Sequence, residues 1–552
     1  MLFVPVEITK NTIGDVFDEV VAQRADAVAL FFKGEEFTYK EIKEKVDLLA
    51  KGLLKLGVKR GDHVAIWMVN RPEWIFFELA IYKIGAVLVT MNTRYRIEEA
   101  RHILGQSDAT TIILSDRFWK CEFMEMFCEL VPELQSSEPG ALKSTVFPLL
   151  RTVISLGSSS QKGAFDLDGV MALGRGVSDK ELARAQSACD PKDVALIIYT
   201  SGTTGNPKGA MASQKSILSR ELTYNQWFKV TEDDHVFCGT PLFYIFACVT
   251  GVLGTFRAGG KLCLMETFDA EEALKIIDAE SCTVINGVPS MFIMMIEHPD
   301  FAKYDVSSCR TGIMGGSPMP VSQASAVIER MVPQIASVWG LTECVTNATA
   351  TRLGDPGDLV ASTVGVALPD CEVLVFDPAT NQPLPPGMQG ELRIRSAANM
   401  VGYYKMPEAT AKVFGDDGWL RTNDLGVMDE NGYFKITGRI SDMFIVGGMN
   451  AYPAEIENHI AKHPKVAQVE VIGVPDHRLG EVSMAFVMLK NGQTATEEEI
   501  IEFCRGKLAN FKMPRYVRFV SEFPLTVTGK VQKFKLQEQA QKELGLAGVF
   551  TR

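Results

Sequence analysis

Residues 199–209 form a short run, YTSGTTGNPKG, whose composition suits phosphate binding. The run holds three glycines, four hydroxyl side chains within five residues, and one cation, Lys208. Glycine lets backbone N–H groups approach phosphate oxygens, and hydroxyls and a lysine add further donors. The loop of nucleoside triphosphatases reads Gly-x4-Gly-Lys-Ser/Thr, but here Gly202 and Gly205 are three apart and Gly209 follows Lys208. The run therefore predicts a polyphosphate site of another class, with a plain solvated loop as the alternative.

Five further motifs follow along the chain. They read GGSP at 315–318, WGLTE at 339–343, GWLRTNDLG at 418–426, GRISDMFIVGGMN at 438–450 and PLTVTGKVQK at 524–533. Together with the run at 199–209, they resemble in kind and order the motifs of the adenylate-forming superfamily, which contains acyl-CoA synthetases, nonribosomal peptide adenylation domains and beetle luciferases. The resemblance extends over nearly the whole chain and is greatest to the fatty or aromatic acid–CoA ligases.

The resemblance implies an ATP site made from these motifs. The residues that it assigns to nucleotide binding are Thr200, Ser201, Gly202, Thr203, Thr204, Gly205, Lys208, Gly315, Gly316, Ser317, Pro318, Trp339, Gly340, Leu341, Asp424 and Arg439. Trp339 offers a flat face to adenine, and Asp424 and Arg439 can bind the ribose. Thr342 is placed at the phosphates and Glu343 at a magnesium ion, which prefers carboxylate and phosphate oxygens. A core tryptophan and a surface salt bridge are the alternatives for Trp339 and Arg439.

The same resemblance implies a two-step ligase reaction with ATP, Mg²⁺ and CoA. A carboxylate attacks ATP to give an acyl-adenylate and pyrophosphate, and a thiol then displaces AMP. The catalytic roles are assigned to Lys530, Thr342 and Glu343. Lys530 would stabilise charge as the carboxylate attacks the α-phosphate. Because Lys533 and Lys535 lie close by, this assignment depends on the Thr-Gly-Lys context.

A chain of 552 residues is too long for one ordinary core, so two or more domains are expected. Strand and helix patterns alternate in the N-terminal part, which predicts an α/β fold. We expect a large N-terminal domain at 1–440, with layered α/β subdomains and a β-rich subdomain from about Ala367, and a small mobile α+β domain at 441–552. Residues 135–165 are interrupted by Ser, Pro and Gly and predict a surface excursion.

In the superfamily the small domain rotates between the two half-reactions about a hinge two residues after the motif arginine. That position here is Ser441, where the family usually has Asp or Lys, so the hinge departs from the family pattern. A small residue can still serve as a hinge. Gly447 and Gly448 would line the thiol tunnel, where glycine allows close passage of a pantetheine arm, and an ordinary turn is the alternative.

The resemblance places the acyl pocket in PLFYIFACVTG at 241–251 and NGVPSMFIMMIEHP at 286–299. Its candidate residues are Phe243, Tyr244, Ile245, Asn286 and Gly340. Tyr244 replaces a gating histidine of the family and cannot carry its positive charge. Acetate-type members have a tryptophan at the position of Gly340, so the glycine predicts a deeper pocket. No Lys or Arg is placed to pair with a second charge, which favours an apolar monocarboxylate: medium-chain, branched, alicyclic or aromatic.

The net charge of −12 disfavours nucleic acid and anionic membranes as main partners, because both need clustered Lys and Arg. The 11 irregularly spaced cysteines predict reduced thiols in a cytoplasmic enzyme, and no secretory signal or transmembrane run is expected. The expected partners are a small-molecule carboxylate, ATP and CoA, and a homodimer fits the resemblance. One alternative is an acyl-AMP ligase that loads a carrier protein. The other is a non-catalytic or oxygenase relative, and the presence of Lys530 and Glu343 disfavours a loss of catalysis.

Overall fold

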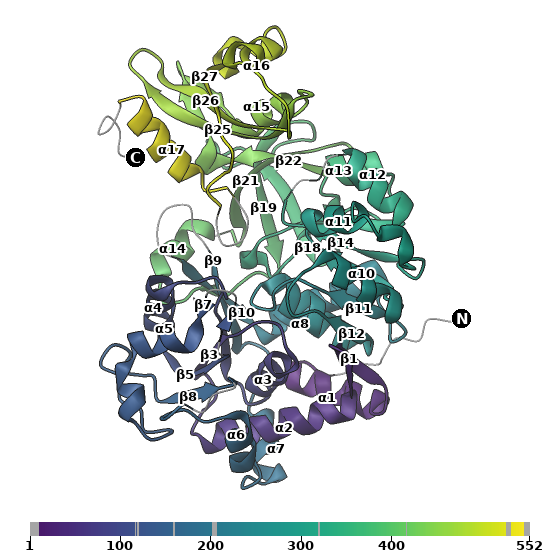
Figure 1. Ribbon diagram of the computed structural model, residues 1–552, viewed down its shortest axis with the longest axis vertical. Helices are drawn as coiled ribbons and strands as arrows, with labels where there is room; N and C mark the ends of the chain where they lie inside the picture. Colours follow the sequence, from purple (N-terminus) through teal and green to yellow (C-terminus); the bar gives the residue numbers. More distant parts are fainter. Residues whose placement is uncertain are drawn as a thin grey trace. The chain divides into compact units, whose positions relative to one another are not determined.

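The computed structural model describes residues 10–115, 117–118, 121–157, 161–200, 207–317, 319, 321–415, 417–525 and 531–545. The chain divides into two compact units (Figure 1). Unit 1 comprises Met1–Val373 and Ile394–Leu420, and unit 2 comprises Leu374–Arg393 and Arg421–Arg552. The predicted fold class, a large layered α/β part with a β-rich part and a small α+β part, is confirmed. The boundary between residues 440 and 441 and the mobility of the small domain stay predictions.

Unit 1 contains a nine-stranded sheet in the order β17-β16-β15-β14-β13-β11-β12-β1-β2. Its strands are β1 (Val28–Phe32), β2 (Glu35–Thr38), β11 (His235–Cys238), β12 (Lys261–Leu264), β13 (Val284–Gly287), β14 (Thr311–Gly315), β15 (Gln334–Trp339), β16 (Thr349–Ala350) and β17 (Val366–Ala367). The six strands from β15 to β1 are parallel, and β2, β16 and β17 are antiparallel to their neighbours. The inner strands are almost wholly buried, as expected for parallel strands covered on both faces.

A second, seven-stranded sheet of unit 1 has the order β20-β10-β9-β4-β3-β5-β8. Its strands are β3 (His63–Trp67), β4 (Val87–Thr90), β5 (Ala109–Leu114), β8 (Thr152–Ser155), β9 (Val194–Thr200), β10 (Lys208–Ser213) and β20 (Gly402–Tyr403). Strand β8 falls within residues 135–165, which the sequence predicted as a surface excursion. All four residues of β8 are buried, so the prediction is wrong for this strand, which forms one edge of the sheet.

Helices pack on both sheets of unit 1 (Figure 1). They are α1 (Ile13–Arg24), α2 (Tyr39–Lys55), α3 (Pro72–Lys83), α4 (Ile97–Ser107), α5 (Phe123–Leu130), α6 (Leu167–Gly174), α7 (Asp179–Ser187), α8 (Gln214–Phe228), α9 (Gly254–Ala258), α10 (Ala270–Ala279), α11 (Pro289–Ile296), α12 (Val321–Arg330), α13 (Gly357–Ser362) and α14 (Pro407–Val413). One hydrophobic core includes Leu88 of the seven-stranded sheet, Val236 of the nine-stranded sheet and most of α3, so the two sheets share it. Ser213 caps α8 by accepting the N–H of Ser216.

Unit 2 contains most of a four-stranded sheet, β18-β19-β21-β22, and a five-stranded sheet in which β27 joins the path β24-β23-β26-β25. The strands are β18 (Cys371–Phe376), β19 (Gln389–Ser396), β21 (Leu420–Met428), β22 (Phe434–Arg439), β23 (Phe444–Val446), β24 (Met449–Ala451), β25 (Val466–Asp476), β26 (Gly480–Leu489) and β27 (Pro514–Phe519). The helices are α15 (Pro453–Ile460), α16 (Glu497–Cys504) and α17 (Lys533–Glu543). On β26, Ala485 and Val487 pack with α15 and α16, whereas Met484 and Phe486 pack with α17, so the helices cover opposite faces. Among the described residues no helix combines the length and the apolar character that a membrane span needs.

The buried carboxyl of Glu221 on α8 gives a prediction about stability. Its side chain is 2% exposed, and its Oε1 has no hydrogen-bond partner among the described residues. Burial raises the pKa of Glu221 from 4.5 to about 8, with Arg257 opposing the shift. Because the folded state then binds this proton more tightly than the unfolded state, the free energy of unfolding falls as pH rises from about 4.5 to about 8.

Glu221→Gln keeps the shape of the protonated acid and cannot ionise. It is expected to raise the free energy of unfolding near pH 8 by about 3 kcal/mol and to change it little near pH 5, as measured by urea unfolding. The matched control is Glu44→Gln on the exposed face of α2, which should change the free energy by less than about 0.5 kcal/mol at either pH. An equal effect of Glu221→Gln at both pH values would contradict the prediction.

Candidate active site

Four of the predicted site segments lie at one edge of the nine-stranded sheet. Strands β11, β13, β14 and β15 are parallel neighbours, so their carboxyl ends meet at the same edge. The segments at these ends carry residues 243–245, 286, 315–317 and 339–343, respectively. Open α/β sheets bind ligands at this kind of edge. The fold therefore gathers the segments that the sequence assigned to the acyl group, the adenine and the phosphates.

The glycine- and hydroxyl-rich run connects β9 to β10. In this antiparallel pair Thr200 lies opposite Lys208, and the Thr200 hydroxyl donates to the Lys208 carbonyl at 3.5 Å. His102 on α4 has Nε2 3.1 Å from the Pro207 carbonyl oxygen, and Gln106 on the same helix contacts the Tyr199 hydroxyl. Both ends of the predicted phosphate loop are thus held. The loop residues Ser201, Gly202, Thr203, Thr204 and Gly205 lie outside the described residues.

Tyr403 of β20 contacts both the phosphate hairpin and the WGLTE motif. Its hydroxyl donates to Glu343 Oε1 at 2.7 Å, and the Lys208 ammonium lies 5.3 Å from the centre of its ring. A cation over an aromatic ring is a favourable contact. Burial and the neighbouring Glu343 carboxylate raise the pKa of Tyr403, so the phenol stays protonated and donates a hydrogen bond to the carboxylate. One side chain therefore lies against the predicted phosphate lysine and the predicted magnesium ligand.

The backbone around Tyr403 joins the same two motifs. Strand β20 pairs with β10, and the Tyr404 N–H donates to the Gly209 carbonyl at 2.8 Å. The Met400 N–H donates to the Glu343 carbonyl, also at 2.8 Å. Glu343 lies on a single turn, η4 (Thr342–Cys344), directly after β15. Residues 400–404 therefore form a strap that places this turn beside the hairpin.

Glu343 fits a magnesium ion that is bound together with phosphate. One of its carboxylate oxygens accepts from Tyr403, and the other has no hydrogen-bond partner among the described residues. The described part of the chain holds no group of three or more His, Cys, Asp or Glu side chains that could bind a metal by itself. Magnesium is usually held by one or two carboxylates with substrate phosphates and water. A single available carboxylate is the donor set that such an ion needs.

The predicted adenine segments differ in exposure. Trp339 is only 8% exposed at the end of β15, so the stacking role and the core role both stay open. Gly315 ends β14, and Gly316 follows with a φ of 92°, a conformation that favours glycine. Gly316 and Ser317 are exposed, and Pro318 lies outside the described residues. The turn after β14 therefore presents its backbone at the surface of this edge.

Gly340 has a packing reason to be glycine. A Cβ added there would lie 1.8 Å from the Thr346 carbonyl oxygen and 2.6 Å from the Asn347 Cα. The space beside the glycine is filled by the backbone of its own loop. This packing is a second explanation for the glycine, so its place in the acyl pocket stays a prediction and the substrate proposal rests on other residues.

Phe243, Tyr244 and Ile245 lie between the ends of the two sheets. The Thr90 hydroxyl donates to the Phe243 carbonyl at 2.9 Å, and the Asn92 amide donates to the Tyr244 hydroxyl at 3.4 Å. Phe243 and Ile245 are 6% and 8% exposed. Burial raises the pKa of Tyr244 to about 12, although the Asn92 hydrogen bond opposes the shift. The segment is apolar and uncharged at neutral pH.

Asn286 is used within the fold. Its Nδ2 donates to the Tyr224 hydroxyl at 2.9 Å, and its Oδ1 accepts the Ile313 N–H at 3.3 Å. The side chain is 2% exposed. These contacts explain Asn286 as a link between β13, β14 and α8, and they give no support to its assignment to the acyl pocket.

In unit 2, Asp424 and Arg439 lie opposite each other on β21 and β22. Arg439 Nε lies 2.8 Å from Asp424 Oδ1, with side chains that are 38% and 6% exposed, respectively. A carboxylate and a partly exposed guanidinium offer an acceptor and donors for a ribose. The ion pair is also the salt bridge that the sequence allowed as the alternative, so the ribose role stays a prediction.

Ser441 follows Arg439 in a short turn, η5 (Ile440–Asp442). Its hydroxyl accepts from Asn423 Nδ2 at 2.9 Å and donates to Asp442 Oδ1 at 3.2 Å. Gly447 and Gly448 form the turn between β23 and β24 with φ values of 58° and 86°, which favour glycine. The turn alone accounts for the two glycines. Their place in a thiol tunnel and the hinge at Ser441 stay predictions.

Lys530 lies outside the described residues, but the structure distinguishes its neighbours. The Lys533 ammonium donates to Glu457 Oε1 at 2.5 Å and lies 3.6 Å from Glu470 Oε2. Burial would lower the pKa of Lys533, but these two carboxylates outweigh it and hold the pKa above its ordinary value. Lys535 is exposed on α17. Lys533 is thus engaged in an internal ion cluster, which supports the choice of Lys530 as the catalytic lysine.

Four residues near the predicted site were not found from the sequence: Tyr403, Arg220, Asn92 and Arg94. Arg94 is exposed, and its charge opposes the rise in the pKa of Tyr244. Arg220 contacts the turn that bears Glu343. None of the four belongs to a glycine-rich or acidic motif. Arg220 lies beside Glu221 on a helix that also carries Lys215 and several polar residues, so its sequence gives no signal of this contact.

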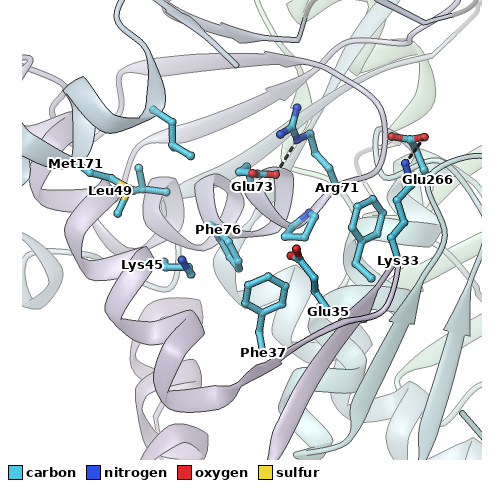
Figure 2. Close-up of a pocket in the computed structure, with 13 residues that line it drawn as sticks. Lys33, Glu35, Phe37, Lys45, Leu49, Arg71, Glu73, Phe76, Met171 and Glu266 are labelled. Carbon is cyan, nitrogen blue, oxygen red and sulfur yellow. Dashed lines mark hydrogen bonds and ion pairs between the residues drawn. The ribbon is translucent and has the colours of Figure 1, made fainter. Parts of the chain in front are cut away.

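A cavity of about 460 Å³ lies in another part of unit 1 (Figure 2). It is lined by β1, β2, α2, the start of α3, α6 and Glu266, and none of the predicted site residues lines it. Phe37 and Phe76 form part of its wall, with the Lys45 ammonium 5.9 Å from each ring centre. Lys33 pairs with Glu266 and Arg71 with Glu73, and the lining holds three basic and three acidic side chains, so its charge indicates no class of ligand.

These features define the class of adenylate-forming enzymes. They are a layered α/β unit with a glycine- and hydroxyl-rich run between two strands, a Thr-Glu turn at the carboxyl edge of its sheet, and a smaller α+β unit. Comparison with protein families agrees. Residues 17–404 match the family described as AMP-binding enzyme, and residues 455–530 match its C-terminal domain. The chain belongs to the AMP-binding enzyme family, within the adenylate-forming superfamily.

Relatives of known name narrow the activity. The chain is 41% identical to YngI of Bacillus subtilis, whose name assigns it provisionally to the acyl-CoA synthetases, over 98% of this chain and 99% of YngI. It is 36% identical to the mitochondrial medium-chain acyl-CoA ligase ACSF2 of Mus musculus, over 98% of this chain and 89% of that protein. The ATP-bound crystal structure of MatB from Rhodopseudomonas palustris superposes with a TM-score of 0.83 at 29% identity, over 96% of this chain and 99% of MatB. The chain is therefore an AMP-forming acid–thiol ligase that uses ATP.

Proposed function

We propose that this chain joins an apolar monocarboxylate to CoA through an acyl-adenylate. The observation that carries the proposal is the segment after β11, where Phe243 and Ile245 are buried and Tyr244 is uncharged at neutral pH. Burying a second charge of a substrate there without a partner would be costly. Arg94, the cation near Tyr244, is exposed and does not line a buried wall. An apolar tail of medium-chain, branched, alicyclic or aromatic type is therefore favoured.

The first half-reaction makes the adenylate. A carboxylate oxygen of the acid attacks the α-phosphorus of ATP, and the bond from that phosphorus to the bridging oxygen of pyrophosphate breaks. The protein needs no nucleophile of its own, because positioning and neutralisation of charge supply most of the rate. Lys208 would bind the departing phosphates, Thr342 the α-phosphate, and Lys530 the charge that develops there. Glu343, held by Tyr403, would hold Mg²⁺, which neutralises phosphate charge when bound.

The second half-reaction makes the thioester. The CoA sulfur attacks the acyl carbonyl carbon, and AMP leaves with the electrons of the mixed anhydride bond. In this proposal residues 441–552 rotate about Ser441 between the two steps, so that Lys530 serves the first and the turn at Gly447 and Gly448 serves the second. The small hydrogen-bonded Ser441 side chain supports a hinge that can be released at low cost.

The name of the mouse relative, a medium-chain acyl-CoA ligase, supports the choice of substrate class. The experiment is a panel of carboxylates from acetate to dodecanoate with benzoate and cyclohexanecarboxylate, and malonate as the matched diacid. Pyrophosphate and AMP would be measured with and without CoA. AMP formation that requires CoA and an apolar acid of about six or more carbons is the result expected from the buried apolar segment.

Other outcomes lead to different functions. Turnover that is fastest with malonate or acetate would overturn the apolar substrate class. Pyrophosphate release without CoA-dependent AMP turnover would favour the acyl-AMP ligase that loads a carrier protein. An exchange of label between pyrophosphate and ATP, measured in the absence of thiol, separates that case from an inactive preparation.

The cytoplasmic location and the homodimer stay predictions. The 11 cysteines are free thiols in the structure. Reduced cysteines are typical of a reducing compartment. Cell fractionation and light scattering of the purified chain would test the two predictions separately.

The Tyr244 hydroxyl predicts how the acid site responds to pH. Since the pKa of Tyr244 is about 12, the phenol stays neutral below that pH and adds no ionisation near neutrality. Tyr244→His is expected to lower the KM for the acid as pH falls below about 6.5, because a protonated imidazole attracts the carboxylate. The expected change in KM is about fivefold between about pH 8 and about pH 5.5.

The matched control is Tyr244→Phe, which loses the contact with Asn92 but introduces no titrating group. Its KM for the acid should follow the wild-type pH profile. The opposite result would be a wild-type KM that changes with pH near neutrality and loses this change in Tyr244→Phe. It would contradict the prediction that Tyr244 does not ionise near neutral pH.

A further inference from the structure

Arg220 on α8 is a buried cation directed at the turn that carries Thr342 and Glu343. Its side chain is 1% exposed. Nε donates to the Val345 carbonyl at 3.0 Å, and one terminal nitrogen donates to the Cys344 carbonyl at 3.1 Å. The other terminal nitrogen pairs with Asp370 at 3.1 Å. The guanidinium therefore binds two consecutive carbonyls of the turn in a fixed fork and is neutralised by one carboxylate.

The turn that Arg220 holds has an unusual backbone. Val345 and Thr346, which follow η4, have φ values of 51° and 80°. Positive φ is uncommon outside glycine, and for a β-branched residue it is a genuine outlier. Two such residues in succession persist only where the surroundings fix them, and residues of this kind cluster at functional sites. The carbonyls that Arg220 binds belong to Val345 and to Cys344, the residue directly before it.

Other contacts hold the same turn from different sides. Gly340 leaves room for the Thr346 carbonyl, and the Cys344 thiol lies 3.2 Å from the Leu341 N–H. The Met400 N–H binds the Glu343 carbonyl. These contacts close the turn on itself and tie it to the strap, whereas Arg220 is its link to α8. Without Arg220, the buried carbonyls of Cys344 and Val345 would lose their charged donor.

We propose that Arg220 is a positioning residue for pyrophosphate release: it fixes the left-handed turn after Glu343 and thereby the direction of Thr342 and Glu343 toward the phosphates and magnesium. It is not a catalytic residue, because its guanidinium is hydrogen-bonded to the Cys344 and Val345 carbonyls and to Asp370. The inference rests on the proposed roles of Thr342 and Glu343. It adds that these roles depend on a cation from a helix outside the motifs.

The structure offers a matched control. Arg310 also pairs with one carboxylate, Asp234, at 2.6 Å, and donates to two backbone carbonyls, those of Phe228 and Lys229. These carbonyls lie at the end of α8, away from the Thr-Glu turn. Arg310→Met therefore removes contacts of the same kind, from a more exposed side chain, without touching the Thr-Glu turn. Asp370→Asn is the second control, because it removes the charge of the ion pair and leaves both carbonyl contacts of Arg220.

The test compares Arg220→Lys and Arg220→Met with these controls. Arg220→Lys keeps a cation beside Asp370 but cannot reproduce the fork. Both Arg220 variants are expected to lower kcat for pyrophosphate formation by about 30- to 100-fold, because small displacements of catalytic groups have effects of this size. The KM for the acid should stay within about threefold of wild type, since the hydrogen bonds that Arg220 makes go to the Thr-Glu turn, Asp370 and Cys371. Arg310→Met and Asp370→Asn should lower the melting temperature and leave kcat within about threefold.

Two further measurements keep the result decisive. Calorimetry of ATP binding with and without Mg²⁺ measures the effect of the turn on affinity in the absence of catalysis. The Arg220 variants should lose most of the magnesium-dependent gain in affinity that the controls retain. Gly340→Ala should reproduce the loss, because its Cβ would displace the Thr346 carbonyl of the same turn. Wild-type kcat and wild-type magnesium dependence in a folded Arg220→Lys would overturn the proposal. Failure of wild type with every acid, while magnesium-dependent ATP binding still requires Arg220, would overturn the substrate class alone.

Discussion

Glutamine in place of Glu343 is expected to slow pyrophosphate formation by about 10²- to 10³-fold, the usual loss when one charge-stabilising group is removed from a transition state. The substitution keeps the size of the side chain and an oxygen that can accept the Tyr403 hydroxyl, so the strap at residues 400–404 stays in place. Only the negative charge is lost. Since magnesium prefers carboxylate oxygens, the concentration of Mg²⁺ needed for half-maximal rate should rise as kcat falls.

Tyr403→Phe is the matched variant for the hydrogen bond. It leaves the carboxylate of Glu343 and removes only the donor at 2.7 Å. We expect a loss of about tenfold or less in kcat, with a smaller change in the magnesium requirement than in Glu343→Gln. Pyrophosphate release measured across a series of Mg²⁺ concentrations separates the two variants. A Glu343→Gln enzyme with the wild-type magnesium requirement would show that Glu343 acts only through Tyr403.

The sequence predicts the fold class and the location of most motifs because both depend on local patterns. Buried strands alternating with helices predict a parallel sheet, and motifs that follow such strands must meet at its carboxyl edge. The turn at Gly315 and the turn at Glu343 are two examples, at the ends of the neighbouring strands β14 and β15. The hairpin between Thr200 and Lys208 follows from two apolar strands around a glycine-rich run. Each of these needs no information from distant parts of the chain.

Contacts between distant segments could not be predicted in this way. Tyr403 reaches Glu343 because β20 adds to the edge of β10, a pairing that the two residues of β20 do not signal. The sequence shows Arg220 only as a charged residue on a helix. Its hydrogen bond to the Val345 carbonyl becomes evident only in the structure. The prediction for the residues of β8 failed for a related reason. The sequence of these four residues does not distinguish a strand from a loop, and their position is set by pairing with the neighbouring strand β5.

Gly340 shows how one residue can have two explanations. The sequence comparison with acetate-type enzymes treats the missing side chain as empty space. In the structure the space is occupied by the Thr346 carbonyl, because the left-handed turn folds back against the end of β15. The volume of a pocket depends on backbone that comes later in the chain, so the identity of one wall residue does not determine it.

Alanine in place of Lys530 is expected to give the largest effect of all, a loss of about 10³-fold or more in adenylate formation. A lysine that stabilises the attacked α-phosphate has no part in attack of the thiol on the acyl carbonyl. The rate of acyl-CoA formation from a supplied acyl-adenylate and CoA should therefore stay within about tenfold of wild type. Stopped-flow measurement of the two half-reactions on the same preparation distinguishes the steps.

The two neighbouring lysines serve as controls because the structure gives them different surroundings. Lys535→Ala removes an exposed cation and should leave both half-reactions unchanged. Lys533→Met leaves the carboxylates of Glu457 and Glu470 without their cation. This cluster is partly exposed, so the loss of stability should be smaller than the roughly 3–5 kcal/mol typical of a fully buried pair. Its signature is thus a lower melting temperature, with both half-reactions reduced together if the domain loosens. Selective loss of the first step in Lys530→Ala alone would identify the lysine that reaches the phosphate, whereas equal loss of both steps would mean that Lys530 supports the small domain rather than the chemistry.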